Sequence, residues 1–391
     1  MTAPRHPSTI LASAGIAAGP GRRALVPPIE VSDTFRWDDP ATKPDYDYSR
    51  TVNPNRDLLV AALAELEGAA GGVVTNSGQS AALLALLTLP AGALVVAPQD
   101  CYGGTYRLIQ GLADQGKLAA LFVDQRDDAA FAAAMARKPA LVWIETPSNP
   151  LLRIVDIAKR AAEAKAAGAV VIADNTLPTP LRQQPLALGC DLVLHSTTKA
   201  LNGHADLFGG ALLAADPALV ETLHWWANAA GLSSSATDAS QILRGLRTLP
   251  LRVGRQEATA RAIAGWLAAQ PGISEVHYPG LDSYPDHALA ARQQSGPGFM
   301  IAFRIRGDTG TFLKSLSLIT LASSLGGFAS LICVPATMTH RGMPPEARAE
   351  AGIHPDLLRL SVGLEEPADL IADLTHGLAA CVPTFKEQEE K

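Results

Sequence analysis

The chain has few cysteines and no long apolar run. Only four of its 391 residues are cysteine, and Cys101, Cys190, Cys333 and Cys381 lie far apart in sequence. No two of them have C-x-x-C spacing, which argues against a zinc site or a disulfide framework and favours a reducing compartment. No apolar run approaches the roughly 20 residues that span a bilayer. We therefore expect a cytoplasmic protein that uses no metal and has no membrane partner.

An excess of charge of one sign is also missing. The chain carries 32 Lys and Arg against 38 Asp and Glu, a net charge of -6, without long runs of either sign. This pattern argues against nucleic acid and acidic membranes as partners. Hydrophobic residues, by contrast, make up 48% of the chain, which is ample for a sizeable core. The length predicts two domains, or one large domain with appendages.

Three segments of the chain differ in their residue pattern. Residues 1–56 are rich in Pro, Gly, Asp and Arg and show no sustained period, so we interpret them as an N-terminal arm that lies on another surface, such as a second subunit. Strands alternate with helices over residues 57–250, which predicts an α/β domain whose mostly parallel sheet has helices on both faces. An amphipathic helix over 251–270 then opens a smaller α+β domain, residues 251–391.

One stretch, residues 189–210, combines a buried strand with reactive side chains. The apolar run 192–194 is followed at once by hydroxyl residues and Lys199, as expected for a strand that opens onto a polar site. Desolvation lowers the pKa of such a lysine and makes it a nucleophilic amine, although a lysine after a strand is more often a solvated loop residue. Ser196 and Thr198 alternate, so an extended segment would direct both hydroxyls at an anion.

A carboxylate ends the preceding strand of the same pattern. The apolar run 169–173 stops at Asp174, and burying that side chain is costly unless it meets a cation. Asp174 and Lys199 lie 25 residues apart, each after an apolar strand. Because neighbouring parallel strands joined by a crossover end at the same edge of a sheet, we expect both side chains there.

A helix N-terminus and a tyrosine add to this edge. A short strand over 72–75 leads through a turn of small residues into a helix that starts near Gly78 and Gln79, which presents free backbone N–H groups to an anion or is an ordinary capped helix. Tyr102 follows another strand and precedes two glycines. This ring either lies flat against a cofactor or is a half-buried core residue.

Further candidates lie outside these strands. Tyr48 and Arg50 in the arm offer a hydroxyl and a fork of donors, which is either ordinary surface or a phosphate clamp. Asn149 lies in a turn at the end of a strand, where open α/β sheets bind ligands. Arg359 faces opposite to its apolar neighbours in a strand, either as an edge residue whose charge reaches solvent or as an anchor for a carboxylate.

Seven segments together resemble one family. YSR, NSGQSA, CYGGTYR, ETPSNPLLR, ADNT, HSTTK and RLSVG are similar to segments of the fold-type I pyridoxal-phosphate (PLP) enzymes of cysteine and methionine metabolism, and the resemblance runs over nearly the whole chain. LVLHSTTKALNGHAD, WWAN, LLRIVDIAK and ATMTHRGMPPEARAEAGI resemble most closely the branch that forms cystathionine. The resemblance implies the fold of a PLP-dependent transferase, with a large mostly parallel sheet domain, an N-terminal arm and a smaller α+β C-terminal domain.

The resemblance also implies a role for each residue. Lys199 would be the Schiff-base lysine and proton shuttle, Asp174 would pair with the pyridine nitrogen, and Tyr102 would stack on the ring, so that these three are catalytic. The cofactor pyridoxal 5'-phosphate would be bound by Tyr48 and Arg50 of a neighbouring subunit and by Gly78, Gln79, Tyr102, Asp174, Thr176, Ser196, Thr198 and Lys199. The substrate would be bound by Asn149, Arg359, Ser324, Arg107 and Asp47.

The implied enzyme is a homotetramer made of two tight dimers and acts on amino-acid substrates. Its implied reaction is γ-replacement on O-succinyl- or O-acetylhomoserine with L-cysteine, which gives cystathionine. Elimination from cystathionine, sulfhydrylation of the same O-acylhomoserine and a catalytically inert PLP-binding protein are the alternatives. Thr51 and Ser323 stand where the cystathionine-forming branch usually has an arginine and a glutamate of the distal pocket, so the acyl group and the nucleophile stay open.

Overall fold

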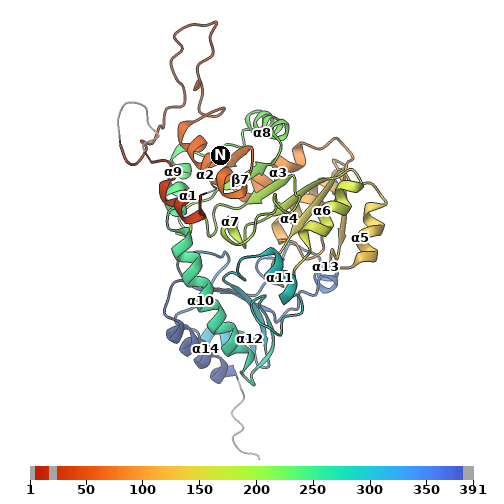
Figure 1. The fold of residues 1–391 in the computed structure, drawn as a ribbon. Helices are drawn as coiled ribbons and strands as arrows, with labels where there is room; N and C mark the ends of the chain where they lie inside the picture. The colour runs from red at the N-terminus through yellow and green to blue at the C-terminus, as the bar shows by residue number, and fades with distance from the viewer. Residues whose placement is uncertain (1–4, 17–23, 382–391) are drawn as a thin grey trace, which may run out of the picture.

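The larger of two sheets lies in the upper body of the molecule (Figure 1). The computed structural model describes residues 5–16 and 24–381; residues 1–4 and 17–23 of the expected arm and 382–391 of the expected C-terminal domain lie outside this description. In the described part, the large sheet has the order β1-β7-β6-β5-β4-β2-β3. Its strands are β1 (Gly71–Thr75), β2 (Leu94–Pro98), β3 (Ala119–Val123), β4 (Leu141–Glu145), β5 (Val170–Asp174), β6 (Leu192–His195) and β7 (Gly210–Ala214).

Most neighbouring strands of this sheet run parallel, as predicted. The pairs β2–β3, β2–β4, β4–β5 and β5–β6 are all parallel. The exception is β7, which the sequence pattern did not reveal and which pairs antiparallel with both β6 and β1. Because β5 and β6 are parallel neighbours, the polar residues that follow them reach the same edge of the sheet.

Helices cover both faces of the large sheet, which confirms the predicted layers. Leu141 and Trp143 of β4 pack into a core with α3 (Gly78–Leu87), α4 (Gly103–Asp114) and α8 (Pro217–Ala230). Val142 and Ile144, which alternate with them, pack on the opposite face with α5 (Asp128–Met135) and α6 (Ile157–Ala166). On that opposite face, α2 (Pro54–Glu67) and α9 (Ala236–Leu246) cover β1 and β7.

A smaller sheet forms the lower body, in the order β10-β11-β12-β9-β8. Its strands are β8 (Ile273–His277), β9 (Met300–Ile305), β10 (Thr320–Leu321), β11 (Leu331–Cys333) and β12 (Leu358–Ser361). The helices of this region are α11 (His287–Gln293), α12 (Thr309–Ser315), α13 (Pro345–Glu350) and α14 (Pro367–Cys381). Leu358 and Leu360 enter the core beneath α14, which leaves Arg359 on the other face as predicted. The expected strand over 317–321 shortens to β10, whereas β8 and β11 were not expected.

One long helix, α10 (Leu249–Ala268), runs from the large sheet to the small one (Figure 1). Val253 near its start packs in the core with α2 and α9. Ile263 and Leu267 near its end pack in the core of the small sheet. The two sheets therefore share one rigid element, and the domain boundary that we place at residue 250 remains an interpretation.

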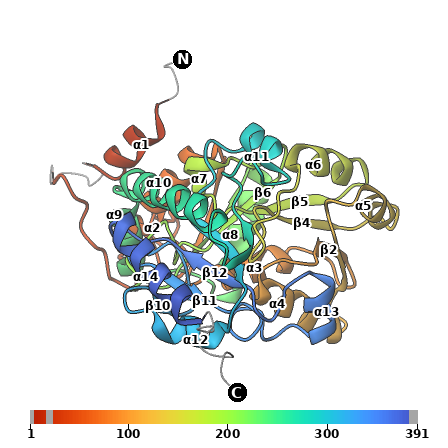
Figure 2. The same ribbon diagram turned by 90° about the horizontal axis from the view of Figure 1, so that it is seen from below.

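The N-terminal segment has one buried helix and a long exposed stretch. In α1 (Pro7–Ser13), Leu11 is fully buried against α2, so part of the expected arm lies on its own chain. Residues 31–46 are mostly exposed and form a loop that extends away from the body (Figures 1 and 2). None of the helices in the described ranges has the length and apolar character that crossing a bilayer requires.

Candidate active site

A cavity of about 550 Å³ opens where the parallel strands of the large sheet end. The C-terminal ends of such strands are where open α/β sheets bind ligands. Most of the predicted site residues line this one cavity: Gly78, Gln79, Tyr102, Arg107, Asn149, Asp174, Thr176, Ser196, Thr198, Lys199, Ser324 and Arg359. The small-sheet region also lines the cavity, through Arg359 of β12 and Ser324 of the segment between β10 and β11.

The segment after β6 turns sharply instead of extending. The Lys199 N–H donates to the Ser196 carbonyl over 3.2 Å, which closes a turn. Thr198 is bonded to Gly209, the residue before β7: its N–H donates to the Gly209 carbonyl over 3.2 Å, and its hydroxyl accepts from the Gly209 N–H over 2.9 Å. Our expectation of an extended Ser196–Thr198 segment is therefore wrong. Both residues still line the cavity.

The Lys199 amine lies deep in the cavity. Its Nζ donates to the hydroxyl of Ser324 over 3.0 Å. Burial, together with the positive charge of Arg359, lowers the pKa of the amine from 10.5 to about 8. An amine with this pKa is substantially neutral near pH 8, so it is available as a nucleophile and as a base.

Arg359 is a buried cation that pairs with no carboxylate among residues 5–16 and 24–381. Only 2% of the residue is exposed. Its guanidinium donates to Asn149 Oδ1 over 2.7 Å and to the Ser324 carbonyl over 3.0 Å, and its Nε has no partner among the described residues. Ser324 itself has φ of 92°, a left-handed conformation that non-glycine residues rarely adopt. A fork-shaped donor held in this way suits a planar carboxylate.

Two buried carboxylates lie side by side at the end of the sheet. Glu145 of β4 is the register partner of Asp174 of β5, and both line the cavity. Burial raises the pKa of the Asp174 carboxyl. The Thr176 N–H, which donates to Asp174 Oδ1 over 3.0 Å, acts in the opposite direction and lowers this pKa in part. Burial also raises the pKa of Glu145 well above its ordinary value, and the charge of Asp174 adds to this effect. Sequence reasoning missed Glu145, although it follows an apolar strand in the same way as Asp174.

The residues that line the cavity include a candidate anion cradle, formed by the start of α3 and the turn after β6. Helix α3 begins at Gly78 behind its cap Ser77, so its first backbone N–H groups have no acceptor within the helix. A Cβ on Gly78 would lie 2.7 Å from the Cβ of Ser196, so only glycine allows the helix to approach the turn this closely. The hydroxyl of Thr176 accepts from the Ser196 N–H over 2.8 Å and fixes that turn.

Three predicted residues lie away from the cavity in the single chain. Arg50 donates to Asn228 Oδ1 over 2.8 Å, and Tyr48 is 42% exposed. Asp47 faces Lys43 at 3.5 Å. Their assignment as contacts to a neighbouring subunit remains a prediction. Of the two divergent positions, Ser323 lines the cavity, whereas the Thr51 hydroxyl donates to Asn228 over 3.3 Å.

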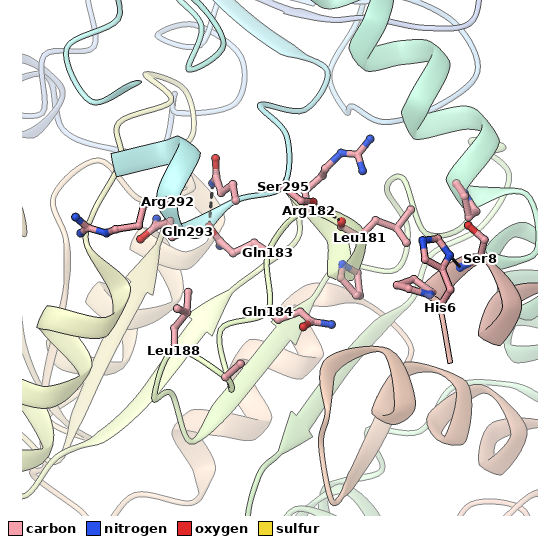
Figure 3. A pocket seen from close by; sticks show the side chains of 15 residues that line it. His6, Ser8, Leu181, Arg182, Gln183, Gln184, Leu188, Arg292, Gln293 and Ser295 are labelled. Atoms are coloured by element: carbon pink, nitrogen blue, oxygen red, sulfur yellow. Dashed lines mark hydrogen bonds between the residues drawn. The ribbon is translucent and has the colours of Figure 1, made fainter. Parts of the chain in front are cut away.

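A second, larger cavity of about 840 Å³ lies between α1, α7 (Thr179–Arg182) and α11 (Figure 3). Its two arginines are already paired, Arg182 with Glu257 at 2.8 Å and Arg292 with Asp156. None of the predicted site residues lines it, so we assign the chemistry to the smaller cavity.

The residues of the smaller cavity suit the aldehyde, ring and phosphate of PLP. The lowered pKa of Lys199, the buried carboxylate of Asp174 and the close approach at Gly78 are the observations that fit. With the doubly covered sheet, they define a PLP-dependent enzyme of fold type I. The Cys/Met metabolism PLP-dependent enzyme family matches residues 8–379, and the chain belongs to this family.

Relatives match along almost the entire chain. Cystathionine gamma-synthase of Escherichia coli strain K12 is 50% identical over 380 residues, which cover 96% of this chain and 98% of the relative. Cystathionine gamma-lyase of Bacillus subtilis strain 168 is 39% identical over 95% of this chain and 98% of the relative. The crystal structure of cystathionine gamma synthase from Xanthomonas oryzae pv. oryzae in complex with cystathionine superposes with a TM-score of 0.95 at 48% identity, covering 96% of this chain and 98% of that one.

Proposed function

We propose that this enzyme catalyses γ-replacement on an O-acylhomoserine with L-cysteine to give cystathionine. The observation that carries the proposal is the shared hydrogen bonding of Lys199 and Arg359 to Ser324, which places an amine of lowered pKa beside a carboxylate anchor. Support also comes from the Escherichia coli relative, named cystathionine gamma-synthase, and from the relative whose structure holds cystathionine.

The residues of the cavity would hold PLP at three points. Lys199 would hold its aldehyde, Asp174 would face its ring nitrogen, and Gly78, Gln79, Ser196 and Thr198 would surround its phosphate. When bound, PLP supplies an electron sink that stabilises negative charge at the α-carbon of an amino acid. Tyr102 lines the same cavity and offers a ring to cover the cofactor.

The remaining residues would bind the substrate and move its protons. The Arg359 guanidinium, held by Asn149, would receive the α-carboxylate. Once the substrate amine has displaced it, the Lys199 Nζ would accept the proton from the α-carbon, give that proton up, and then accept one from the β-carbon. The C–O bond at the γ-carbon then breaks, and the acyl group leaves as a free carboxylate. The cysteine thiol loses its proton as its sulfur bonds to the γ-carbon, and the α- and β-carbons take up protons again.

The far end of the cavity would set the choice of acyl group. Arg107 lines the cavity together with Ser323 and offers a positive charge there. A guanidinium at this place favours the free carboxylate of an O-succinyl group over the neutral O-acetyl group.

Asp47, with Tyr48 and Arg50, would reach the cavity only from a second copy of the chain, as in a homotetramer made of two tight dimers. The four cysteines are buried and form no disulfide with one another, and we infer a cytoplasmic location for the enzyme.

Product analysis separates this reaction from elimination, the activity of the gamma-lyase relatives. The purified enzyme is incubated with O-succinyl- or O-acetyl-L-homoserine and L-cysteine, and the products are quantified by mass spectrometry. We expect cystathionine and free succinate or acetate in equal amounts. A parallel reaction with sulfide in place of cysteine tests for homocysteine as the main product. Pyruvate or 2-oxobutyrate from cystathionine as the dominant product would overturn the proposal.

A further inference from the structure

Glu145 binds the backbones of two site residues at once. It is 3% exposed and ends β4. One carboxyl oxygen accepts from the Tyr102 N–H over 2.9 Å, and the other accepts from the Asn149 N–H over 3.1 Å. Tyr102 follows β2 and Asn149 follows β4, so one side chain fixes the start of α4 relative to the turn after its own strand.

His340 contacts the same two residues from the small-sheet side. It is fully buried, and its Nε2 lies 2.8 Å from the Asn149 carbonyl. Because a carbonyl only accepts, Nε2 carries the hydrogen, and Nδ1 accepts from the Thr339 hydroxyl at 2.9 Å. The imidazole also stands edge-on to the Tyr102 ring, with 6.5 Å between ring centroids and 88° between planes. Burial and the charge of Arg359 lower the pKa of His340 to about 3, so the ring stays neutral.

Asn149 is consequently held at three polar groups by side chains from three elements. Its N–H is bound by Glu145, its carbonyl by His340, and its side-chain oxygen by Arg359. The backbone next to Tyr102 also packs tightly against the segment that contains His340. A Cβ on Gly103 would lie only 2.5 Å from the Thr339 carbonyl oxygen. Nothing in this arrangement allows Tyr102 and Asn149 to shift independently.

We propose that Glu145 and His340 are positioning residues that clamp Tyr102 and Asn149 from opposite sides and so set the cofactor-covering ring and the carboxylate anchor in register. The proposal rests on the proposed function for what Tyr102 and Asn149 do. Neither clamp residue needs to transfer a proton to act in this way. Displacing a positioned group by a fraction of an ångström is costly for a reaction that depends on alignment, so the clamp affects activity through its neighbours.

The His340 arm of the clamp is tested with two substitutions in the holoenzyme. His340→Phe keeps a ring and removes the Nε2 donor, whereas His340→Gln keeps a donor at a similar position. We expect the phenylalanine variant to raise KM for O-succinyl-L-homoserine about tenfold, with kcat changed much less, because one hydrogen bond to the anchor is lost. The glutamine variant should remain within about threefold of the parent. Equal KM values for the parent and the phenylalanine variant would refute this arm, as would equal losses in both variants.

The Glu145 arm is tested without activity. Hydrogen exchange of the holoenzyme is followed by mass spectrometry on peptides that contain the Tyr102 and Asn149 amides. Both amides should exchange slowly in the parent, and one of the two should exchange faster in Glu145→Gln, since the glutamine amide keeps an acceptor at only one of its two ends. A parent in which these amides exchange freely contradicts the clamp even if the variant fails to fold. Because this measurement needs no substrate, its failure is distinguishable from failure of the proposed reaction.

Discussion

Lys199 and Arg359 share Ser324 as a hydrogen-bond partner, the amine through the serine hydroxyl and the guanidinium through the serine carbonyl, each over 3.0 Å. Two cations that come so close repel one another, which is one of the two causes of the lowered pKa of Lys199. The pair therefore combines a carboxylate anchor with an amine of lowered pKa, and the pKa of the amine depends in part on the charge of the anchor.

The reactivity of Lys199 should follow its lowered pKa. Well below pH 8 the amine is protonated and cannot attack an aldehyde, so uptake of PLP by the cofactor-free enzyme should slow as the pH falls, with a midpoint near pH 8. Uptake is measured as attachment to Lys199 that resists dissociation after borohydride reduction, followed by mass spectrometry. The Lys199→Arg variant is the control and should show no attachment. A midpoint near 10.5, the ordinary lysine value, would contradict the assignment.

Replacing Arg359 should change two measurements in a defined direction. Arg359→Met removes a positive charge, so the midpoint of PLP uptake should move to higher pH. The same change removes the carboxylate anchor and should raise KM for the amino-acid substrate about 100-fold, in line with the loss of a charge-assisted hydrogen-bonded pair. Arg359→Lys keeps the charge without the fork, and should restore the uptake midpoint more than KM. An unchanged midpoint in the methionine variant argues against the electrostatic link.

At Gly78, where α3 lies close to the turn after β6, no larger residue than glycine should fit. In Gly78→Ala the new Cβ would lie 2.7 Å from the Ser196 Cβ, so α3 or the turn after β6 must move, and PLP affinity should fall at least about tenfold. Gly111 in α4 is the matched control, because a Cβ there meets nothing within 4 Å. Gly111→Ala should leave affinity unchanged and stabilise the helix by up to about 1 kcal/mol. Dissociation constants from fluorescence titration decide the comparison.

The buried pair behind the site should matter for stability. Glu67 and His195 are fully buried at the side chain and lie 2.6 Å apart, and Glu67 also accepts from Asn175 over 2.8 Å. Glu67→Ala leaves the buried His195 without its hydrogen-bond partner, whereas Asn175 keeps its bond to the Gln183 carbonyl. The substitution should cost about 3 kcal/mol, seen as a lower midpoint of thermal unfolding. Glu65→Ala on the same helix breaks only an exposed pair with Arg5 and should cost under about 1 kcal/mol. Similar midpoints for the two variants would show that the buried pair contributes little.

Whether active sites are shared between subunits can be tested by mixing two inactive variants and measuring the activity that is regained. Arg50→Ala and Lys199→Ala should each abolish or strongly lower activity. If Arg50 acts in the cavity of a second copy, mixed dimers carry both defects in one site and none in the other. Unfolding and refolding an equal mixture should then restore about a quarter of the parent activity, because half of randomly paired dimers are mixed. If the mixture stays as inactive as its components, Arg50 acts within its own chain.

Sequence patterns predicted the site residues at the edge of the large sheet, but they did not predict Glu145 and His340, which hold Tyr102 and Asn149 in place. Asp174 and Lys199 follow apolar runs, so parallel pairing alone was enough to bring them together. Glu145 carried the same signal, a carboxylate after an apolar strand, and was overlooked. His340 gave no signal of its own, because its contact with Asn149 joins residues 191 positions apart. Contacts of this length depend on how the two sheets meet, which local patterns do not encode.

Local pattern also failed where hydrogen bonds across the chain override it. The alternation of hydroxyls at Ser196 and Thr198 suggested extension, but the bonds between Thr198 and Gly209 draw the chain into a turn. The strand β7 was not predicted, and the apolar run at 210–214 does not by itself indicate which way such a strand would run. It lies antiparallel between β1 and β6, a placement that only the complete sheet order specifies.

Because α10 packs in the cores of both sheets, the number of its residues between the two cores fixes how the sheets are placed relative to each other. Each residue of an α-helix turns the chain by about 100° and advances it by about 1.5 Å. A single insertion between Val253 and Ile263, which pack in the two separate cores, would swing the strand that bears Arg359 around the helix axis relative to Lys199. Changes of length are therefore forbidden in this helix, whereas its exposed positions, such as Leu251, are open to substitution.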